Sequence, residues 1–444
     1  MRAFLKRINN LNFWIIFPAV VFIFFLMPVI TVLSSLLGEY SDNWSHLYNT
    51  VLFDYFRNSL FLLIGVSAIT LVVGAGTAWL VSNFDFLGKR FFEWALILPL
   101  SIPPYILAYT FTGLFDSYGT LNNLMRDIFD LNQSFIFFPN VRNIYGAIIV
   151  FSFTLYPYIY LVSRSAFLNQ SRSILESGRI LGLNRFEISF KLAMPMIRPA
   201  VIGGLMLVTM ETLSDFGAVE HFAIPTFTTG IFRTWYGMGD LMTAMQLSSF
   251  LLLFICIFLF IENKTRKNAA YVSDSSTHTP IKVEKLSFGY SVLGFIFCSI
   301  PLLIGFVLPV SELAIWAIYY NPSFFNEAFL SAAMNTITLA LIAAILCSLI
   351  AMLINFSIRI NKNRLLIFLS SFLTLGYAFP GLILAVGIVQ TTIFLDRNLI
   401  ENSGFILTGS LFGLLLAYVI KSYALSNNTI SSGMEKISNK LDDS

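Results

Sequence analysis

Apolar runs long enough to cross a lipid bilayer recur along the whole chain and constrain its fold more than any other feature. Hydrophobic residues make up 57% of the sequence and charged residues 11%. A spanning helix needs about 20 apolar residues, and lipid offers the backbone no hydrogen-bond partners. We therefore expect an all-α integral membrane protein with about ten transmembrane helices. The predicted spans are 13–36, 58–82, 92–114, 142–163, 197–219, 241–262, 288–318, 330–358, 365–395 and 403–425.

The distribution of Lys and Arg predicts the orientation of these spans. Arg2, Lys6 and Arg7 precede a first span that is too long for a signal peptide and lacks a small-residue cleavage site. With the N-terminus in the cytoplasm, nearly all of the 27 basic residues lie inside, as the positive-inside rule requires. The five outside are Arg57, Arg126, Arg142, Arg233 and Arg397. The net charge of +3 therefore reflects topology and not nucleic-acid binding.

A polar cytoplasmic linker at residues 263–285 separates two halves, 1–262 and 286–444, which resemble each other. Asn58-Ser59-Leu60 opens the second span of the first half, and Asn335-Thr336-Ile337 opens the matching span of the second. A short basic turn follows each of these spans. The repeat predicts two halves built on one plan, with six spans in the first and four in the second.

Each half carries a proline in the span that follows this turn. Pro104 lies in the segment Ile102–Ala108, and Pro380 lies in the segment Ala378–Ala385. A proline inside a helix frees a carbonyl and kinks the helix, so the repeated position indicates a cavity wall or hinge of a transport pathway. Prolines are also common in membrane helices without such a role.

The segment 172–195, between the fourth and fifth spans, has the pattern of two short helices joined by a glycine. Two residue pairs have capping-box spacing, so each starts a helix: Ser173 with Glu176, and Asn184 with Glu187. Gly182 can take the left-handed conformation that ends the first helix. The pattern predicts a helix–glycine–helix hook, after which Pro195 restarts the chain as the fifth span.

The hook is expected to offer apolar side chains to a partner's groove, inside a ring of basic residues. The apolar side chains are those of Ile174, Leu175, Ile180 and Leu181. The basic residues are Arg164, Arg172, Arg179, Arg185, Lys191 and Arg198. Capping and charge alone favour a plain cytosolic loop, so the functional interpretation depends on the motif spacing.

That spacing resembles the coupling loop of ABC-type import permeases, which reads E-A-A, three residues, G, nine residues, I-x-L-P. The matching residues here are Glu176, Ser177, Gly178, Gly182, Leu192, Met194 and Pro195. Ser177-Gly178 in place of Ala-Ala is a departure from the family pattern. The segments Leu98–Tyr109, Met210–Glu220, Phe227–Asp240 and Gly376–Gly381 are similar to ferric-iron-type ABC permeases, which are fused two-half proteins with about twelve spans.

The resemblance covers nearly the whole chain and implies an ABC type I importer permease in a bacterial inner membrane. It implies two cytoplasmic ABC ATPase subunits, which use ATP and Mg²⁺, and a periplasmic binding protein that delivers ferric iron. No cofactor or metal is expected to be bound by this chain itself. Related permeases move thiamine, phosphonates or polyamines, and no residue here separates these cargoes.

The repeat alignment places Asp443 opposite Glu176, at the start of a second coupling loop. A complete permease of this type is expected to continue for roughly 85 residues, which carry that loop and two further spans. The second half, 286–444, is therefore expected to be incomplete. The alternative is a second half that naturally ends at Ser444.

Glu211 and Asp215 lie four residues apart in the fifth predicted span, hence on one helix face. Carboxylates are costly to bury in a bilayer, and hard cations favour oxygen ligands, so the pair is a candidate station on the transport pathway. The alternative is a hydrogen-bonded structural pair at the helix end. His221 and Glu93 are expected to be interfacial residues.

The sequence shows no catalytic constellation, so the chain is predicted not to be an enzyme. Gly88-Lys89 is followed by Arg90, and Asn83 stands where a Walker A motif would begin. A proton-coupled secondary transporter, with Glu211 and Asp215 as proton relays, is a further alternative, since such carriers also use repeats and broken helices. A proton-driven carrier, however, has no use for an ATPase-binding loop.

Overall fold

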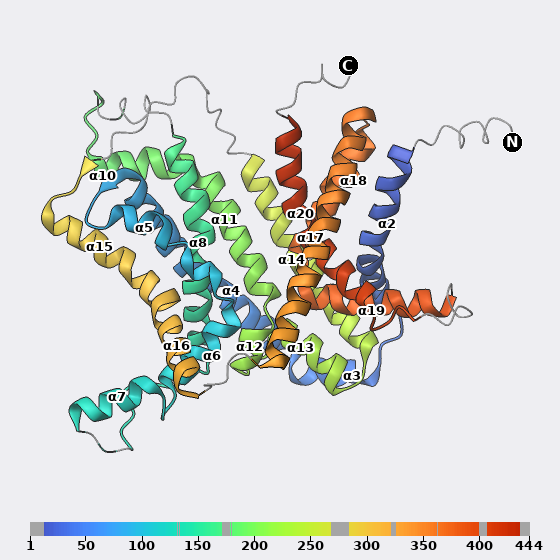
Figure 1. Ribbon diagram of the computed structural model, residues 1–444, viewed down its shortest axis with the longest axis horizontal. Coiled ribbons are helices and arrows are strands. Elements are labelled where there is room, and N and C mark those ends of the chain that lie inside the picture. Colours follow the sequence, from blue (N-terminus) through green and yellow to red (C-terminus); the bar gives the residue numbers. More distant parts are fainter. Residues whose placement is uncertain are drawn as a thin grey trace. The chain divides into compact units, whose positions relative to one another are not determined.

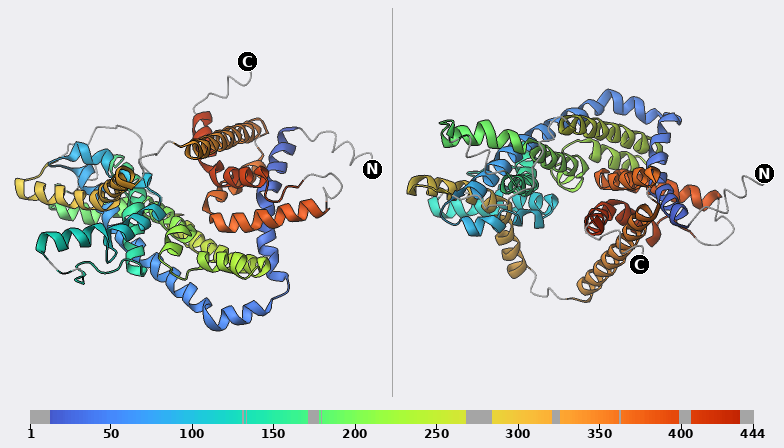
Figure 2. Two further views of the ribbon diagram at one scale, coloured as in Figure 1. Left: turned by 60° about the horizontal axis from the view of Figure 1, so that its bottom comes forward. Right: turned by 90° about the horizontal axis from the view of Figure 1, so that it is seen from above.

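Helices connected by short turns form nearly all of the chain that the computed structural model describes, which is residues 13–130, 132, 134–170, 178, 180–267, 284–320, 326–361, 363–398 and 406–435 (Figures 1 and 2). They group into two units. Unit 1 comprises Met1–Ser45, Ile231–Leu252 and Ser323–Ser444, and unit 2 comprises His46–Gly230 and Leu253–Pro322. Three helices run from one unit into the other: α3 (Asp42–Thr50), α13 (Phe227–Phe232) and α14 (Leu241–Lys267).

Unit 2 is built mostly from the first half of the sequence. Its first-half helices are α4 (Leu52–Asn83), α5 (Lys89–Ala95), η2 (Leu98–Ser101), α6 (Pro104–Phe115), α7 (Thr120–Phe129), α8 (Ile144–Leu168), α10 (Arg185–Ile188), η3 (Ser189–Ala193), α11 (Met194–Ser214) and α12 (Gly217–His221). Its second-half helices are α15 (Phe288–Leu302), η5 (Leu303–Val307) and α16 (Leu308–Tyr320). Strand β1 (Phe84–Asp85) pairs in parallel with β2 (Glu284–Lys285).

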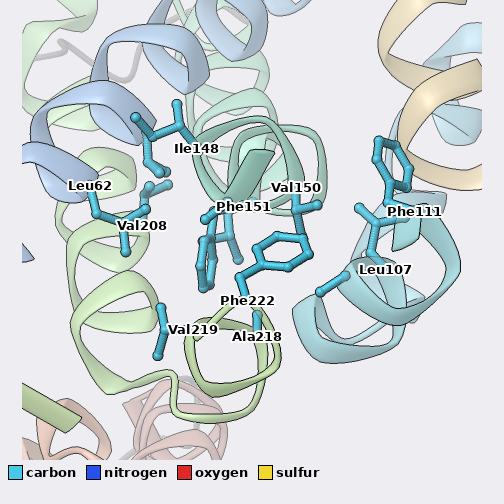
Figure 3. Close-up of a cluster of buried hydrophobic side chains, with 14 of the residues drawn as sticks. Leu62, Leu107, Phe111, Ile148, Val150, Phe151, Val208, Ala218, Val219 and Phe222 are labelled. Carbon is cyan, nitrogen blue, oxygen red and sulfur yellow. The ribbon is translucent and has the colours of Figure 1, made fainter. Parts of the chain in front are cut away.

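Helix α8 lies at the centre of unit 2 and packs against α4 and α11. Glycines make this packing close: a Cβ at Gly74 of α4 would lie 2.7 Å from the Tyr156 carbonyl oxygen, and one at Gly204 of α11 would lie 2.9 Å from Ile159 Cα. Small residues at such contacts let membrane helices approach each other. The neighbouring apolar cluster, which includes Phe151 and Phe222, is shown in Figure 3.

Unit 1 is built around the long helix α17 (Glu327–Asn361), which packs against α20 (Leu411–Glu435). The other elements are α2 (Phe13–Ser34), η1 (Ser35–Leu37), η4 (Arg233–Gly237), α18 (Arg364–Leu373), η6 (Thr374–Ala378) and α19 (Gly381–Asn398). The hydroxyls of Thr31 on α2 and Thr391 on α19 lie 3.1 Å apart. A Cβ at Gly387 of α19 would lie 2.5 Å from the Pro28 carbonyl oxygen, so this glycine admits α2.

The units follow the predicted halves only in part, because the opening span of each half packs with the other half. Helix α2, from the first half, packs against α17, α18 and α19 in unit 1. The seventh predicted span, now α15 and α16, packs against α4, α5 and α6 in unit 2. The linker at 263–285 thus separates the two halves of the sequence, but it does not separate the two packed units. Residues 268–283 of the linker lie outside the described chain.

The structure repeats the order of elements that the sequence repeat predicts. Helices α4, α5, η2 and α6 in unit 2 match α17, α18, η6 and α19 in unit 1. The prediction that the two prolines kink continuous helices is wrong. Both prolines stand where one helix ends and the next begins. Pro104 is the first residue of α6, Pro380 precedes α19, and the chain bends there by 91° and 114°. A change of direction this large requires a break, because a kinked helix retains most of its hydrogen bonds.

The described residues contain most of the predicted spans as apolar helices. Seven helices are long and apolar enough to cross a membrane, or up to nine if each bent pair forms one span. The tenth predicted span, 403–425, does not qualify. The helix in its place, α20, begins later, at Leu411, and becomes polar beyond Ser426.

Candidate functional site

The first arm of the predicted hook ends at Gly182 in the way that the sequence predicts. Gly182 has a φ of +77°, and the Leu183 amide donates to the Gly178 carbonyl at 3.1 Å. This hydrogen bond across a left-handed glycine is the Schellman motif, which satisfies a carbonyl at a helix end. A turn of this kind fixes the direction in which the chain leaves the first arm.

The second arm begins with the predicted capping box. The Glu187 amide donates to Asn184 Oδ1 and the Asn184 amide donates to Glu187 Oε2, both at 2.9 Å. Lys191 Nζ lies 2.9 Å from Glu187 Oε1. The hydrogen bond from Lys191, followed by that from the Asn184 amide, holds the pKa of Glu187 below its ordinary value. The charged form of Glu187 thus stabilises the start of this arm.

The second arm continues directly into α11, which corrects the prediction that Pro195 restarts the chain. Helix α10 passes into the π-helical turn η3, where the Met194 amide donates to the Ser189 carbonyl, and then into α11. Pro195 is the second residue of α11, directly after the π-helical turn, and it lacks the N–H that a residue inside a helical run would donate. The hook therefore shares one continuous helical run with a membrane-crossing segment.

The two arms of the hook meet at Gly178. A Cβ at this position would lie 2.8 Å from Leu192 Cδ1 and 3.1 Å from Ile188 Cγ1. The glycine that departs from the family's alanine therefore lies at a close contact between the arms. The Gln170 amide group also donates to the Ala193 carbonyl at 2.8 Å, which ties the end of α8 to the second arm.

The turn of the hook presents apolar side chains to its surroundings. Ile180 is 86% exposed and Leu181 79% exposed, and Phe190 on η3 is also exposed. Ile174, Leu175, Glu176 and Ser177 lie outside the described residues. In Figure 1 the hook is marked by α10, at the end of unit 2 that also holds α5; we call this the hook end. Two exposed apolar residues on a turn fixed by capping form a candidate binding surface.

The predicted pair of pathway carboxylates lies at the end of α11, where Glu211 belongs to the last turn and Asp215 directly follows the helix. Helix α11 ends at Ser214, and Asp215 adopts an extended conformation with its amide bonded to the Glu211 carbonyl. Asp215 Oδ1 instead accepts a hydrogen bond of 2.8 Å from the Ala218 amide at the start of α12. Asp215 therefore has a structural role at the start of α12, and its part in a transport pathway stays a prediction.

A threonine cluster, which the sequence analysis missed, holds the chain around Asp215. The Thr228 hydroxyl donates to the Asp215 carbonyl at 2.8 Å, and the Thr226 amide donates to Thr229 Oγ1 at 2.8 Å. Asn58 Nδ2 donates to the Pro225 carbonyl at 3.0 Å. The signal was available in the threonine-rich run 226–229, which alone does not reveal its partners. We call this region, opposite the hook in Figure 1, the α12 end of unit 2.

The other two singled-out residues have structural partners. His221 Nε2 lies 2.9 Å from the Thr112 hydroxyl. Glu93 lies 3.7 Å from Arg164 Nη2 and 3.9 Å from Lys89 Nζ, so it is part of an ion-pair network at the hook end. Among the described residues no group of three or more His, Cys, Asp or Glu side chains is arranged to hold a metal ion.

Residues 70–267 match the family described as the inner membrane component of binding-protein-dependent transport systems. The match includes the hook, α11 and the α12 end, set among helices that can cross a membrane. This region is therefore a transport permease domain of the ABC importer type, which confirms the recognition made from the hook motif. The family is one of permeases and not of catalysts.

Two similar proteins come from Haemophilus influenzae. Its Fe(3+)-transport system permease protein FbpB 2 is 25% identical over 390 residues, 87% of this chain and 71% of the relative. Its putative ferric transport system permease protein FbpB 1 is 23% identical over 412 residues, 87% of this chain and 62% of the relative. The chain thus spans only about two thirds of the length of these relatives.

A third similar protein is the molybdate/tungstate transport system permease protein WtpB of Methanocaldococcus jannaschii. It is 24% identical over 204 residues, which is 46% of this chain and 75% of the relative. The similarity to this permease therefore extends over less than half of the chain.

Proposed function

We propose that the chain is the membrane subunit of an ATP-driven importer and that the hook is its contact with a cytoplasmic ATPase. The observation that carries this proposal is the hook itself: a glycine-capped turn with exposed Ile180 and Leu181, within the region that matches the permease family. ATP and Mg²⁺ would be used by two separate ATPase subunits, and the permease itself would bind no cofactor.

The geometry supports a direct mechanical role for the hook. Its second arm is continuous with α11, and α11 packs against α8 and α4 at the centre of unit 2. A partner that moves the turn at Ile180 would therefore move a membrane-crossing helix, because only the capped turn 181–184 separates Ile180 from the helical run. Glu211, Asp215, Pro104 and Pro380 are proposed to line the pathway that such a motion opens.

We propose a multi-pass protein of a bacterial inner membrane, with its N-terminus and the hook in the cytoplasm. The basic residues Lys89, Arg90 and Arg164 belong to the hook end of unit 2, in agreement with the positive-inside rule. A periplasmic binding protein would then meet the opposite side of the permease.

Ferric iron is the cargo that the comparisons support best. The two ferric transport permeases match along 87% of the chain, whereas the molybdate/tungstate permease matches along 46%. Uptake of radioactive iron in cells that carry the complete system tests this assignment. We expect uptake that excess molybdate, thiamine, phosphonate or polyamine does not reduce. Competition by one of these compounds would reassign the cargo and leave the hook proposal intact.

The hook proposal is tested by the substitution Gly182→Val. Valine strongly disfavours a positive φ, so the turn is expected to open and ATPase binding to fall. A matched control is Gly409→Val, since Gly409 also has a positive φ, +75°, and open space around its Cα. We expect co-purification of the ATPase and iron uptake to be lost in the first variant only, with both proteins present in the membrane. Wild-type binding and uptake in Gly182→Val would overturn the assignment, and uptake driven by a proton gradient without the ATPase would favour a secondary transporter.

A further inference from the structure

Helix α7 (Thr120–Phe129) has its polarity reversed relative to a helix on the surface of a soluble protein. Asn122 and Arg126, one turn apart, are 1% and 6% exposed. Leu124 and Ile128, also one turn apart, are 47% and 61% exposed. The polar stripe is therefore buried against the protein and the apolar stripe is presented to the surroundings, which costs free energy if the surroundings are water.

The buried polar side chains of α7 bond to the segments on both sides of the helix. Asn122 Oδ1 accepts hydrogen bonds from the Phe137 and Phe138 amides at 3.0 and 2.9 Å, and Asn122 Nδ2 donates to the Asp116 carbonyl at 2.9 Å. Arg126 Nη2 donates to the Ser117 carbonyl at 2.7 Å. These bonds fix the rotation of the helix, so its apolar stripe is held outward.

A second contact fixes the start of α7 to the helical bundle. The Thr120 hydroxyl donates to Glu312 Oε1 of α16 at 2.6 Å, and Glu312 is 1% exposed. The positive end of the α7 dipole also stabilises a carboxylate beside the first residue of the helix. The helix is thus held in place at the end of the bundle rather than hanging on a loose loop.

The exposed part of α7 divides into an apolar face and a polar edge. Leu121, Leu124, Met125 and Ile128 follow the i, i+3, i+4, i+7 spacing of one face. Thr120, Asn123 and Asp127 follow i, i+3, i+7 and form a separate exposed polar edge. Phe129, at the end of the helix, stacks on Phe137 of the loop with ring centroids 6.4 Å apart, and both rings are about half exposed.

The position of α7 brings this apolar face close to the membrane. Only the segment Asp116–Gly119 connects α7 to α6, so α7 begins within about 15 Å of the end of that helix. In Figure 1, α7 lies at the end of unit 2 opposite α10, with its axis across that of α8. A helix with an apolar face, a polar edge and this orientation has the features of an interfacial membrane helix.

We propose that α7 and the Phe129–Phe137 stack form an interfacial anchor that inserts into the lipid headgroup region at the α12 end of unit 2. Lipid is the occupant because the apolar face flanks the ends of membrane-crossing helices and is bordered by a polar edge that suits water. A soluble protein partner and plain solvent are the competing occupants. The anchor would set the depth of unit 2 in the bilayer.

Spin-label accessibility in the full chain distinguishes these occupants. The label is attached at Leu124→Cys and Ile128→Cys, with Asp127→Cys on the polar edge as the matched control, after Cys256, the exposed native cysteine, is replaced. In vesicles of phosphatidylethanolamine and phosphatidylglycerol we expect labels at 124 and 128 to collide with oxygen and not with an aqueous nickel chelate. The label at 127 is expected to show the opposite preference.

Two results would overturn the proposal. One is access of the nickel chelate to positions 124 and 128 equal to its access to position 127, which would place the face in water. The other is protection of positions 124 and 128 only after a soluble binding protein is added, which would assign the face to that partner. All three substitutions lie at exposed positions, so folding is expected to persist.

Discussion

The hook end and the α12 end of unit 2 differ in where their side chains find partners. At the α12 end, Asp215, Thr228 and Asn58 bond to backbone groups of the same unit at 2.8 to 3.0 Å. At the hook end, the polar groups close a turn while Ile180 and Leu181 are left more than three-quarters exposed. The threonine cluster at the α12 end bonds within its own unit, whereas the turn of the hook holds two apolar side chains in exposed positions.

This difference separates two kinds of functional residue. Ile180 and Leu181 bury little surface within the described chain, and we propose that an external partner covers them. Asp215 caps a helix, and this structural role exists whether or not the carboxylate also meets a cargo. The hook can therefore be tested by binding, whereas Asp215 needs variants that separate capping from charge.

The largest effect is expected from charges placed on the turn of the hook. The double substitution Ile180→Asp and Leu181→Asp should cost about 2–4 kcal/mol of ATPase binding, in the range of an interface hot spot, and abolish co-purification. Leu87→Asp is the control, since Leu87 is an exposed apolar residue after β1, outside the hook. Equal loss of ATPase in the control would remove the distinction between the hook and the rest of its end.

The next effect concerns the carboxylates at the α12 end. Asp215→Asn keeps an oxygen that can accept from the Ala218 amide, whereas Asp215→Ala removes the cap and should cost about 1 kcal/mol of stability. If Asp215 and Glu211 line the pathway, the pair Asp215→Asn and Glu211→Gln should reduce uptake while thermal stability stays near that of the parent. Unchanged uptake kinetics in this pair would leave both residues with a structural role alone.

A smaller effect is expected from the cap of the second arm. Asn184→Ala removes the acceptor of the Glu187 amide and should destabilise the arm by about 1 kcal/mol, with Asn184→Asp as the variant that retains an acceptor. Hydrogen exchange at residues 185–188 measures this directly. We expect faster exchange in the alanine variant only, and equal rates in both variants would show that the arm is held by α11 instead.

The smallest effect is a pH dependence of the same arm. The pKa of Glu187 is lowered in the folded hook, so its charged form stabilises the folded arm. This stabilisation is complete above the ordinary Glu pKa of about 4.3 and is lost as the pH falls through the lower pKa of the folded state. The Asn184 amide donates a hydrogen bond to Glu187, so its protection from hydrogen exchange should decrease on acidification in the parent. The variant Glu187→Gln should show no such dependence, and a decrease in it would assign the titration elsewhere.

Local features of both ends were predictable from the sequence, and features set by distant segments were not. The Gly182 turn and the Asn184–Glu187 box follow from residues within four positions of each other. The end of α11 at Ser214 does not, and the carbonyl of Asp215, which follows it, bonds to Thr228 from thirteen residues further on. Likewise, the repeated position of Pro104 and Pro380 was visible, but the size of the bends was not.

The exchange of opening spans between the two halves shows the same limit on a larger scale. Hydropathy predicts that α2 is a membrane span, but the sequence of α2 does not predict that α19 is its packing partner. The contact depends on Gly387, some 360 residues away, where the absence of a side chain admits the Pro28 carbonyl. A sequence repeat gives the order of elements in each half and leaves open which half each element packs with.

The central claim is that the turn of the hook is buried in an ATPase subunit. A photo-activatable benzoylphenylalanine at position 181, in membranes that contain the chain and the ATPase, tests it most directly. We predict a covalent adduct between the permease and the ATPase on illumination, and none from the same probe at position 124 on α7. Absence of the adduct at position 181, under conditions where the two proteins co-purify, would contradict the account.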